Sequence, residues 1–476
     1  MNQARPILAL DIGSTWTKGA LFLSRNGRLT VAREATTPTT TDDLCRAFGM
    51  VCDEILSVST SERERALSEV DLAYTSSAKG GLSIAASGIV PELTAQAARE
   101  AALSAGGKVT RVFSYRLTAQ DMNELQKSAP DILLLCGGTD GGNEEILRHN
   151  VGIVASSEFK GVVLFAGNRA VAQEAFQVLT QSGKECVLAD NVLPNLEQPQ
   201  PDGAHEAIRT IFLSSIITGK GLNKLVEQTG HAPWPTPLAM LHYVETLHRH
   251  TPAIGDFCLV DLGGATTDYY SASPTGSLTP GALLRGLPEA AVKRSVEGDL
   301  GMRVSAASLF IAAKDIVIST LDEKRLSITD LEHYVSFVSA HPEHLPRDEK
   351  ERELDAVLAR CAVQIASKRH AGRMETVQTA NGPVPVQKGK DLRGVQTLIG
   401  TGGFLARSGS MFHTSDLSPP TLDEAGREIL AARPTRFYID LDYRFPLLAA
   451  ASRLAPNEAA ATGLECLTLI CNSQAI

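Results

Sequence analysis

Three glycine-bearing turns, each following a short apolar run, contain the residues best suited to chemistry. Their sequences are DIGST at 11–15, DLGGATTD at 261–268 and GTGG at 400–403. Backbone amides can approach phosphate oxygens where glycine leaves no side chain in the way. A carboxylate at a strand end is a hard oxygen ligand of the kind that Mg²⁺ prefers, usually through water. Each turn alone is a common sequence, but the three in this order predict a nucleotide site.

Two aspartates begin the first and second turns and are the candidate catalytic residues. Asp11 and Asp261 are expected to face one another across a cleft and to hold Mg²⁺ through water. The turn glycines are expected to let the backbone approach the nucleotide, so Gly402→Val should weaken nucleotide binding while leaving the fold largely intact. Lys18 is expected to neutralise phosphate charge. The predicted nucleotide-binding residues are Gly13, Ser14, Thr15, Thr17, Lys18, Gly263, Gly264, Ala265, Thr266, Thr267, Asp268, Gly400, Thr401, Gly402 and Gly403.

A repeated strand–turn–strand pattern must position these turns. Apolar runs lie on either side of the first turn, and Asn26-Gly27 then predicts a hairpin. The stretch DFCLVDLGGATTDYYSA repeats the pattern around the second turn. From about residue 109 to 195, β-branched or leucine-rich runs alternate with helical patterns, which predicts a parallel sheet covered on both faces.

Composition and charge exclude several classes of function. Hydrophobic residues make up 43% and charged residues 21% of the 476 residues, which is typical of a globular protein of two to four units. The net charge of −9 gives no reason to bind nucleic acid or an anionic membrane. No apolar run approaches the ~18 residues of a membrane span, and a cytoplasmic location is expected. Neither a P-loop nor a G-x-G-x-x-G motif occurs.

A fourth glycine turn, GGTDGGN at 137–143, follows the apolar run DILLLC. Asn143 is a plausible N-cap, and Glu144 and Glu145 suit the first turn of a helix. The turn is interpreted either as a tight strand-to-helix connection or as a second anion or partner site. The two acids argue against phosphate there.

The order of the three turns resembles that of the superfamily of actin, Hsp70 and the sugar kinases. Within it, the sequence resembles the glutamate mutase (methylaspartate mutase) accessory family of the MutL/GlmL type, which is unrelated to the mismatch-repair protein of similar name. Matching stretches run from residue 7 to about 409 and include ILALDIGSTWTKGALF, DILLLCGGTDGGNEEILRHN, CLVDLGGATTDYYS and LIGTGGFLARSG.

This resemblance implies an α/β fold with two ribonuclease H-like (actin-like ATPase) halves around a nucleotide cleft and an additional α/β unit. The expected domains are the first part of the N-terminal half at 1–108, the α/β unit at 109–195, a helical connection and linker at 196–252, and the C-terminal half at 253–476. In this superfamily the second acid often orients the attacking water, which would be the role of Asp261.

The resemblance also implies an ATPase that serves subunits of an adenosylcobalamin-dependent mutase as a reactivating chaperone, with ATP and Mg²⁺ as cofactors. A small-molecule kinase, a hydantoinase-like enzyme and an actin-like structural polymer are the alternatives on the same fold. A kinase needs a positioned carboxylate as base for the substrate hydroxyl. In DLAYTSSAKGGL, Asp71 precedes the expected strand instead of following it.

Overall fold

Contacts divide the chain into two compact units. In this computed structural model, unit 1 comprises Met1–Thr39, Ala47–Ser76 and Ala239–Ile476, and unit 2 comprises Thr40–Arg46 and Ser77–Leu238. The structure describes residues 5–13, 15–40, 42–77, 82–196, 198–217, 222–274, 278–324, 326–380, 382–408 and 417–472.

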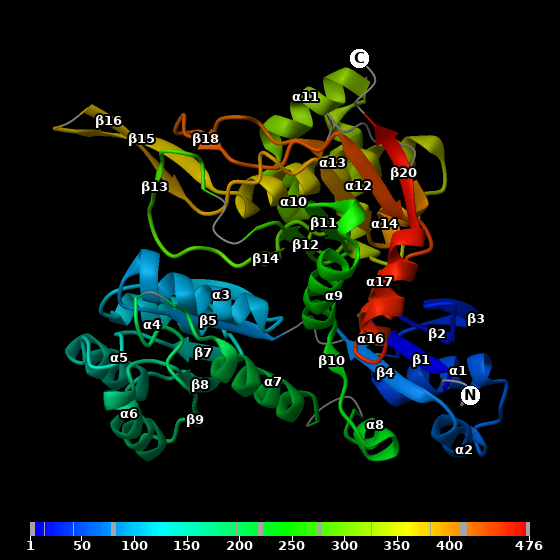
Figure 1. Cartoon of the computed structure of the whole chain (residues 1–476), viewed down its shortest axis with the longest axis horizontal. Helices are drawn as coiled ribbons and strands as arrows, with labels where there is room; N and C mark the ends of the chain where they lie inside the picture. The colour runs from blue at the N-terminus through cyan, green and yellow to red at the C-terminus, as the bar shows by residue number, and fades with distance from the viewer. Residues whose placement is uncertain are drawn as a thin grey trace. The chain divides into compact units, whose positions relative to one another are not determined.

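The first sheet of unit 1 contains strands in the order β4-β1-β2-β3 (Figure 1). β1 pairs antiparallel with β2, which places Asp11 opposite Lys18, and parallel with β4, which places Asp11 beside Thr75. The predicted hairpin is confirmed, since Asn26 and Gly27 both have positive φ between β2 and β3. The elements here are β1 (Ile7–Ile12), β2 (Trp16–Arg25), β3 (Arg28–Pro38), α1 (Leu44–Leu56), α2 (Arg63–Ser68) and β4 (Asp71–Ser76).

The second sheet of unit 1 repeats this arrangement and extends it, with the order β14-β12-β11-β17-β19-β20. β11 pairs antiparallel with β12, so that Asp261 lies opposite Asp268, and parallel with β17, so that Asp261 lies beside Thr401. The strands are β11 (Phe257–Leu262), β12 (Thr267–Ala272), β14 (Val292–Glu297), β17 (Thr397–Thr401), β19 (Arg436–Asp440) and β20 (Leu467–Asn472).

The two sheets share one topology, which confirms the expected fold class. In both, an antiparallel hairpin leads to a third antiparallel strand on one side, while a later strand adds in parallel on the other side of the first. The central strands β1 and β11 consist mostly of buried apolar residues, as strands covered on both faces require. The protein is therefore an α/β protein with two ribonuclease H-like halves and a further α/β unit.

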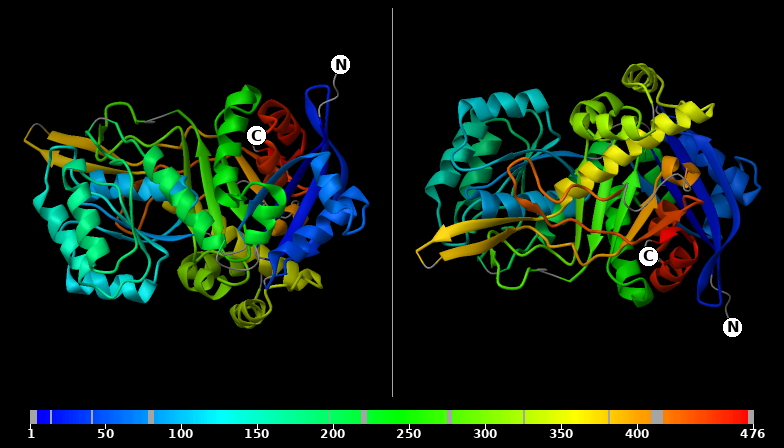
Figure 2. Two further views of the ribbon diagram at one scale, coloured as in Figure 1. Left: turned by 90° about the horizontal axis from the view of Figure 1, so that it is seen from below. Right: turned by 90° about the horizontal axis from the view of Figure 1, so that it is seen from above.

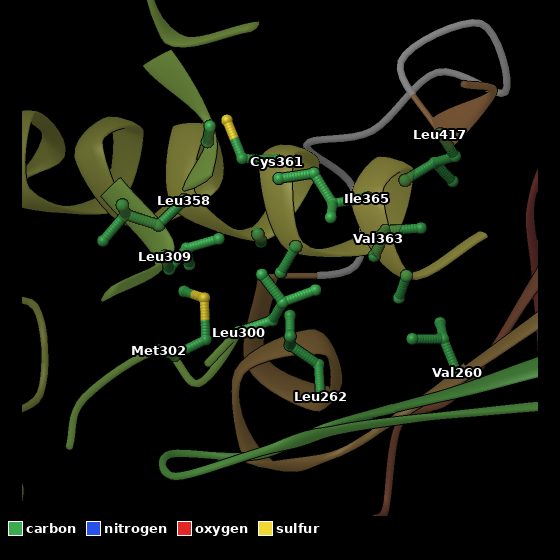
Figure 3. Close-up of a cluster of buried hydrophobic side chains, with 14 of the residues drawn as sticks. Val260, Leu262, Leu300, Met302, Leu309, Leu358, Cys361, Val363, Ile365 and Leu417 are labelled. Carbon is green, nitrogen blue, oxygen red and sulfur yellow. The ribbon is translucent and has the colours of Figure 1, made fainter. Parts of the chain in front are cut away.

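Helix α13 (Glu349–His370) covers the second sheet, as Figure 2 shows. Its side chains from Leu354 to Ser367 are almost all buried. They form a core with Val260 and Leu262 of β11, drawn in Figure 3. The remaining helices of unit 1 are α9 (Thr236–His250), η2 (Pro252–Ile254), α10 (Ala306–Ala312), α11 (Lys314–Lys324), α12 (Ile328–Ala340), α14 (Gly403–Ser408), α16 (Phe445–Ala451) and α17 (Pro456–Glu465).

A smaller sheet of unit 1 has the order β13-β16-β15-β18, in which β15 and β16 form an antiparallel ribbon. Many of the ribbon's side chains are partly or fully exposed. The strands are β13 (Leu283–Leu284), β15 (Arg373–Thr379), β16 (Gly382–Lys388) and β18 (Glu428–Ile429).

Unit 2 is built on a parallel five-stranded sheet with the order β6-β5-β7-β8-β9. Helices α4, α5 and α6 pack on one face, whereas α3 and α7 contact strands from the other. Its sheet includes β5, which precedes the position near 109 where strand–helix alternation is evident in the sequence. The elements are β5 (Ser83–Ser87), η1 (Pro91–Ala95), α3 (Gln96–Ser104), β6 (Lys108–Phe113), α4 (Ala119–Ser128), β7 (Ile132–Leu135), α5 (Glu145–Ala155), β8 (Val162–Phe165), α6 (Arg169–Gln181), β9 (Cys186–Leu188), α7 (Asp202–Ile217), α8 (Leu222–Thr229) and β10 (Trp234–Pro235).

Candidate functional site

Asp11 is the penultimate residue of the fully buried strand β1. The hydroxyl of Thr75, its neighbour on β4, donates a hydrogen bond to Asp11 Oδ1 at 2.9 Å. The preceding residue, Leu10, lies with Val51 and Ile55 of α1 near the position where a side chain on residue 19 would project. Alternation along the strand therefore places the Asp11 carboxylate on the face of the sheet opposite α1.

Asp261 is the corresponding residue of the second sheet. Val260 and Leu262 on either side of it enter the core beneath α13 (Figure 3), so its carboxylate lies on the opposite face of β11. Its Oδ1 atom is buried and has no hydrogen-bond partner among the described residues. Burial, followed by the charges of Asp268 and Asp11, raises the pKa of Asp261 to about 7. The group can therefore accept a proton near neutral pH.

The ammonium of Lys18 interacts electrostatically with acidic side chains of both sheets. It lies opposite Asp11 in the β1–β2 ladder, and its Nζ atom is 3.1 Å from the centroid of the Tyr443 ring. Burial lowers the pKa of Lys18 to about 8, whereas the charges of Asp11, Asp261 and Asp440 act to raise it. The same ammonium therefore interacts electrostatically with aspartates of both halves. Asp11 and Asp261 thus lie close to one another within unit 1.

The segment after β19 contributes to the same site, a role that the sequence did not reveal. Asp440 is fully buried and accepts hydrogen bonds from Thr401 Oγ1 at 3.0 Å and from the backbone amides of Arg444 and Phe445, each at 2.9 Å. It thereby satisfies free amides at the start of α16. Tyr443 follows with φ of +51°, a left-handed conformation that a bulky residue rarely adopts.

The first and second turns close in the same way. Gly13 N donates to Trp16 O and Gly263 N donates to Thr266 O, both at 3.0 Å. A β-carbon on Gly13 would lie 2.7 Å from Trp16 O, and one on Gly263 would lie 2.9 Å from Thr266 O. Glycine is therefore required for closure of both hairpins.

In the third turn, glycine serves the fold as well. Gly402 has φ of +108°, and a β-carbon there would lie 2.4 Å from Leu262 O, on β11. A side chain at Gly402 would push β17 and β11 apart, so the expectation that Gly402→Val leaves the fold largely intact is wrong. Gly400 packs against Leu405, whereas a β-carbon on Gly403 would meet open space.

Other predicted residues near the turns have their polar groups engaged inside the protein. Thr17 Oγ1 is 2.9 Å from Thr39 Oγ1, and Thr267 Oγ1 donates to Leu300 O at 2.6 Å. Asp268 pairs with the buried Arg294 at 2.6 Å. Thr15 and Gly264 are exposed, Ala265 and Thr266 are partly exposed, and Ser14 lies outside the described residues.

Arg303 fixes the second turn through both its backbone and its side chain. The backbone amides of Met302 and Arg303 donate to Gly263 O and Gly264 O at 3.0 and 2.8 Å. The Arg303 guanidinium makes a bidentate bond to Asp355 of α13 at 2.8 and 2.7 Å, and Asp355 is fully buried. This pair fixes the turn to the main helix of the core. No sequence motif marked it, because its partners are 52 residues apart.

The fourth glycine turn, at 137–143, lies in unit 2 and is closed by its own side chains. Asp140 Oδ1 accepts a hydrogen bond from the amide of Arg169 at the start of α6 at 3.1 Å, and Asn191 Nδ2 donates to the same atom at 2.9 Å. The N-cap of α5 is Glu144 instead of the expected Asn143, but Asn143 Oδ1 still accepts a hydrogen bond from Ile146 N at 3.0 Å. The Asp140 carboxylate of this turn therefore binds the first amide of α6.

Among the described residues, no group of three or more histidine, cysteine, aspartate or glutamate side chains has the arrangement of a metal site. Two aspartates with water completing the shell are compatible with Mg²⁺. The unpartnered Oδ1 of Asp261 supplies an oxygen that a hydrated cation would satisfy. Within the same residues, no helix is both long and apolar enough to cross a membrane.

Comparisons with known proteins give one clear family. A family described as MutL protein matches residues 7–466. The chain is 36% identical over 459 residues to Protein MutL of Clostridium tetanomorphum, covering 95% of this chain and 97% of that one. A nucleotide-free acetone carboxylase structure aligns with 94% of this chain and 70% of its own, at 12% identity and a TM-score of 0.43. Xylulose kinase from Lactobacillus acidophilus aligns with 98% and 92%, at 10% identity and a TM-score of 0.30. At these scores the two structures add nothing to the sheet order described above.

Proposed function

We propose, from the premise that the chain belongs to the MutL protein family, that it binds and hydrolyses ATP. We further propose that it acts in the cytoplasm as an accessory protein of an adenosylcobalamin-dependent glutamate (methylaspartate) mutase. The observation that carries the ATP site is the convergence of Asp11 and Asp261 on one ammonium, Lys18. Each acid is the penultimate residue of a strand in a different sheet, just before a glycine turn.

The residues of the site divide into three roles. The backbone around Gly13, Gly263 and Gly402 offers amides to phosphate oxygens and to the adenosine moiety. Asp11 and Asp261 supply carboxylate oxygens for Mg²⁺, which would neutralise charge on the phosphates when bound. Thr75 orients Asp11 by its hydrogen bond. The Asp268 carboxylate is paired with Arg294, and we assign it to the field around Asp261 instead of to direct binding.

Hydrolysis requires a water oxygen to attack the γ-phosphorus while the bond to the bridging oxygen of ADP breaks. The proton lost by water must move to a base, and we assign this role to Asp261, whose buried Oδ1 has no hydrogen-bond partner among the described residues. Lys18 supplies positive charge beside the phosphates. Asp261→Asn should lower ATP turnover by a factor of roughly 10²–10⁴ while affecting ATP binding less.

The experiment compares Asp261→Asn with Glu332→Gln, which neutralises an exposed carboxylate on α12 of the same unit. Phosphate release gives turnover and calorimetry gives ATP affinity. Undiminished turnover in Asp261→Asn would refute its role, and an equal loss in Glu332→Gln would show a non-specific effect of charge.

The accessory role is tested with the mutase itself. Association with mutase subunits should differ by roughly 5–150-fold between the ATP and ADP forms, because a ligand shifts partner affinity only through its preference for one conformation. Mutase inactivated during turnover should recover only with this protein, ATP–Mg²⁺ and fresh adenosylcobalamin together. Recovery that is indifferent to nucleotide would contradict the proposal.

A further inference from the structure

Tyr443 is a residue of the site with an unusual backbone conformation. Its backbone is in the left-handed region at φ +51°, which costs of order 1–3 kcal/mol for a residue with a β-carbon. Such strain persists only where the surroundings hold it in place. Here Asp440, three residues earlier, is fixed by three hydrogen bonds, from Thr401, Arg444 and Phe445.

The ring of Tyr443 presents its face to the ammonium of Lys18. The distance from Nζ to the ring centroid, 3.1 Å, is well inside the ~6 Å limit of a cation–π contact. Asp11, Asp261 and Asp440 all act electrostatically on the charge of this ammonium. The aromatic face therefore anchors this ammonium near the acids.

We infer that Tyr443 is a positioning residue, which holds the Lys18 ammonium beside Asp11 and Asp261 so that it competes with the divalent cation when no nucleotide is bound. This inference rests on the proposed function for the identity of the metal ligands. Two acids from separate sheets and the unpartnered Asp261 Oδ1 form a negative site, and a tethered cation balances it until Mg²⁺ arrives with the phosphates.

The physical consequence is an ordered loading of the site. A divalent cation alone must bind against the positive charge of Lys18, because like charges repel more strongly in a partly buried site than in water. When phosphates are present, the same ammonium has oxygens to contact, and its charge then favours binding. Lys18 should accordingly weaken metal binding alone and strengthen binding of the metal–nucleotide complex.

The test measures Mn²⁺ binding to the nucleotide-free protein from the electron paramagnetic resonance signal of free Mn²⁺. Lys18→Met should bind Mn²⁺ at least tenfold more tightly than the unmodified chain. Tyr443→Leu should do so by about 5- to 30-fold, the range that loss of a desolvated cation–π contact would produce. Tyr443→Phe keeps the ring face and should therefore bind Mn²⁺ with the same affinity as the unmodified chain. Leucine has the same β-carbon constraint at φ +51° as tyrosine, so the backbone cost is unchanged.

A double variant separates positioning from general damage. In the Lys18→Met background, Tyr443→Leu should no longer change Mn²⁺ affinity, because its target charge is gone. Unchanged or weaker Mn²⁺ binding in Lys18→Met would overturn the inference, even if Tyr443→Leu failed to fold. If Asp261→Asn abolishes Mn²⁺ binding but Lys18→Met leaves it unaltered, the inference fails and the proposed metal site stands. If no form of the protein binds Mn²⁺ saturably, both fail.

Discussion

Replacing Asp261 by asparagine should stabilise unit 1 in the absence of metal and nucleotide. The carboxylate is held where burial and the charges of Asp268 and Asp11 disfavour ionisation, and its Oδ1 has no hydrogen-bond partner among the described residues. Asparagine has nearly the same shape and no charge, so the substitution removes the repulsion without leaving a cavity. A candidate catalytic residue is thus expected to lower stability, as strain at functional sites commonly does.

The size and sign of the effect follow from proton linkage. The pKa of Asp261 lies at about 7 in the folded protein against its ordinary 3.8. Between these values the folded state binds the proton more than the unfolded state, so the free energy of unfolding falls as pH rises. Each pH unit corresponds to about 1.4 kcal/mol, giving an upper limit of about 4 kcal/mol above pH 7. Because the residue is partly exposed, we expect about 2 kcal/mol.

The assay is urea unfolding with a chelator present, monitored for unit 1 at several pH values. The difference between Asp261→Asn and the unmodified chain should be small near pH 4, grow to pH 7 and then level. Asp268→Asn is the control on the opposite strand: it removes the partner of buried Arg294 and should destabilise by about 3–5 kcal/mol. Equal stability of Asp261→Asn and the unmodified chain at pH 8 would refute the electrostatic account.

Two further predictions concern the turns. Gly402→Ala should destabilise unit 1 by about 2 kcal/mol or more, because the new β-carbon would combine a positive φ with a close contact to Leu262 O. A β-carbon at Gly403 faces open space, so Gly403→Ala should leave the melting temperature unchanged or raise it slightly. Equal melting temperatures of these two variants would contradict the packing role. Arg303→Met should destabilise unit 1 by about 3–5 kcal/mol, because Asp355 would keep a buried charge without its bidentate partner. Calorimetry should also show weaker ATP binding. Normal ATP affinity would show that the second turn keeps its shape without Arg303.

The sequence predicted the positions of Asp11 and Asp261 because both obey a local rule. Each ends an apolar strand and is followed by a glycine turn and a second strand, and this pattern depends on residues close together in the chain. The hairpin at Asn26-Gly27 is predicted by the same kind of local signal.

The remaining members of the site could not be found in this way, because their roles depend on distant contacts. Tyr443 lies 425 residues from the lysine it contacts, Lys18. Helix α16 begins beside Asp440 and packs on β1. A segment more than 400 residues after β1 in the sequence therefore lies next to it in the fold. The only available signal was that RFYID, like ILALD and CLVD, is an apolar strand ending in aspartate. That similarity would have suggested Asp440 but not the orientation of Tyr443.

The two halves place opposite charges at equivalent positions beside their aspartates. Lys18 lies opposite Asp11 in the first ladder, whereas Asp268 lies opposite Asp261 in the second. Asp11 faces a cation and also accepts a hydrogen bond from Thr75, whereas burial, followed by the charge of Asp268, raises the pKa of Asp261. A carboxylate with a raised pKa suits a general base, which is the role that we propose for Asp261. The repeated topology thus provides two equivalent acids, and the residue on the neighbouring strand makes them chemically different.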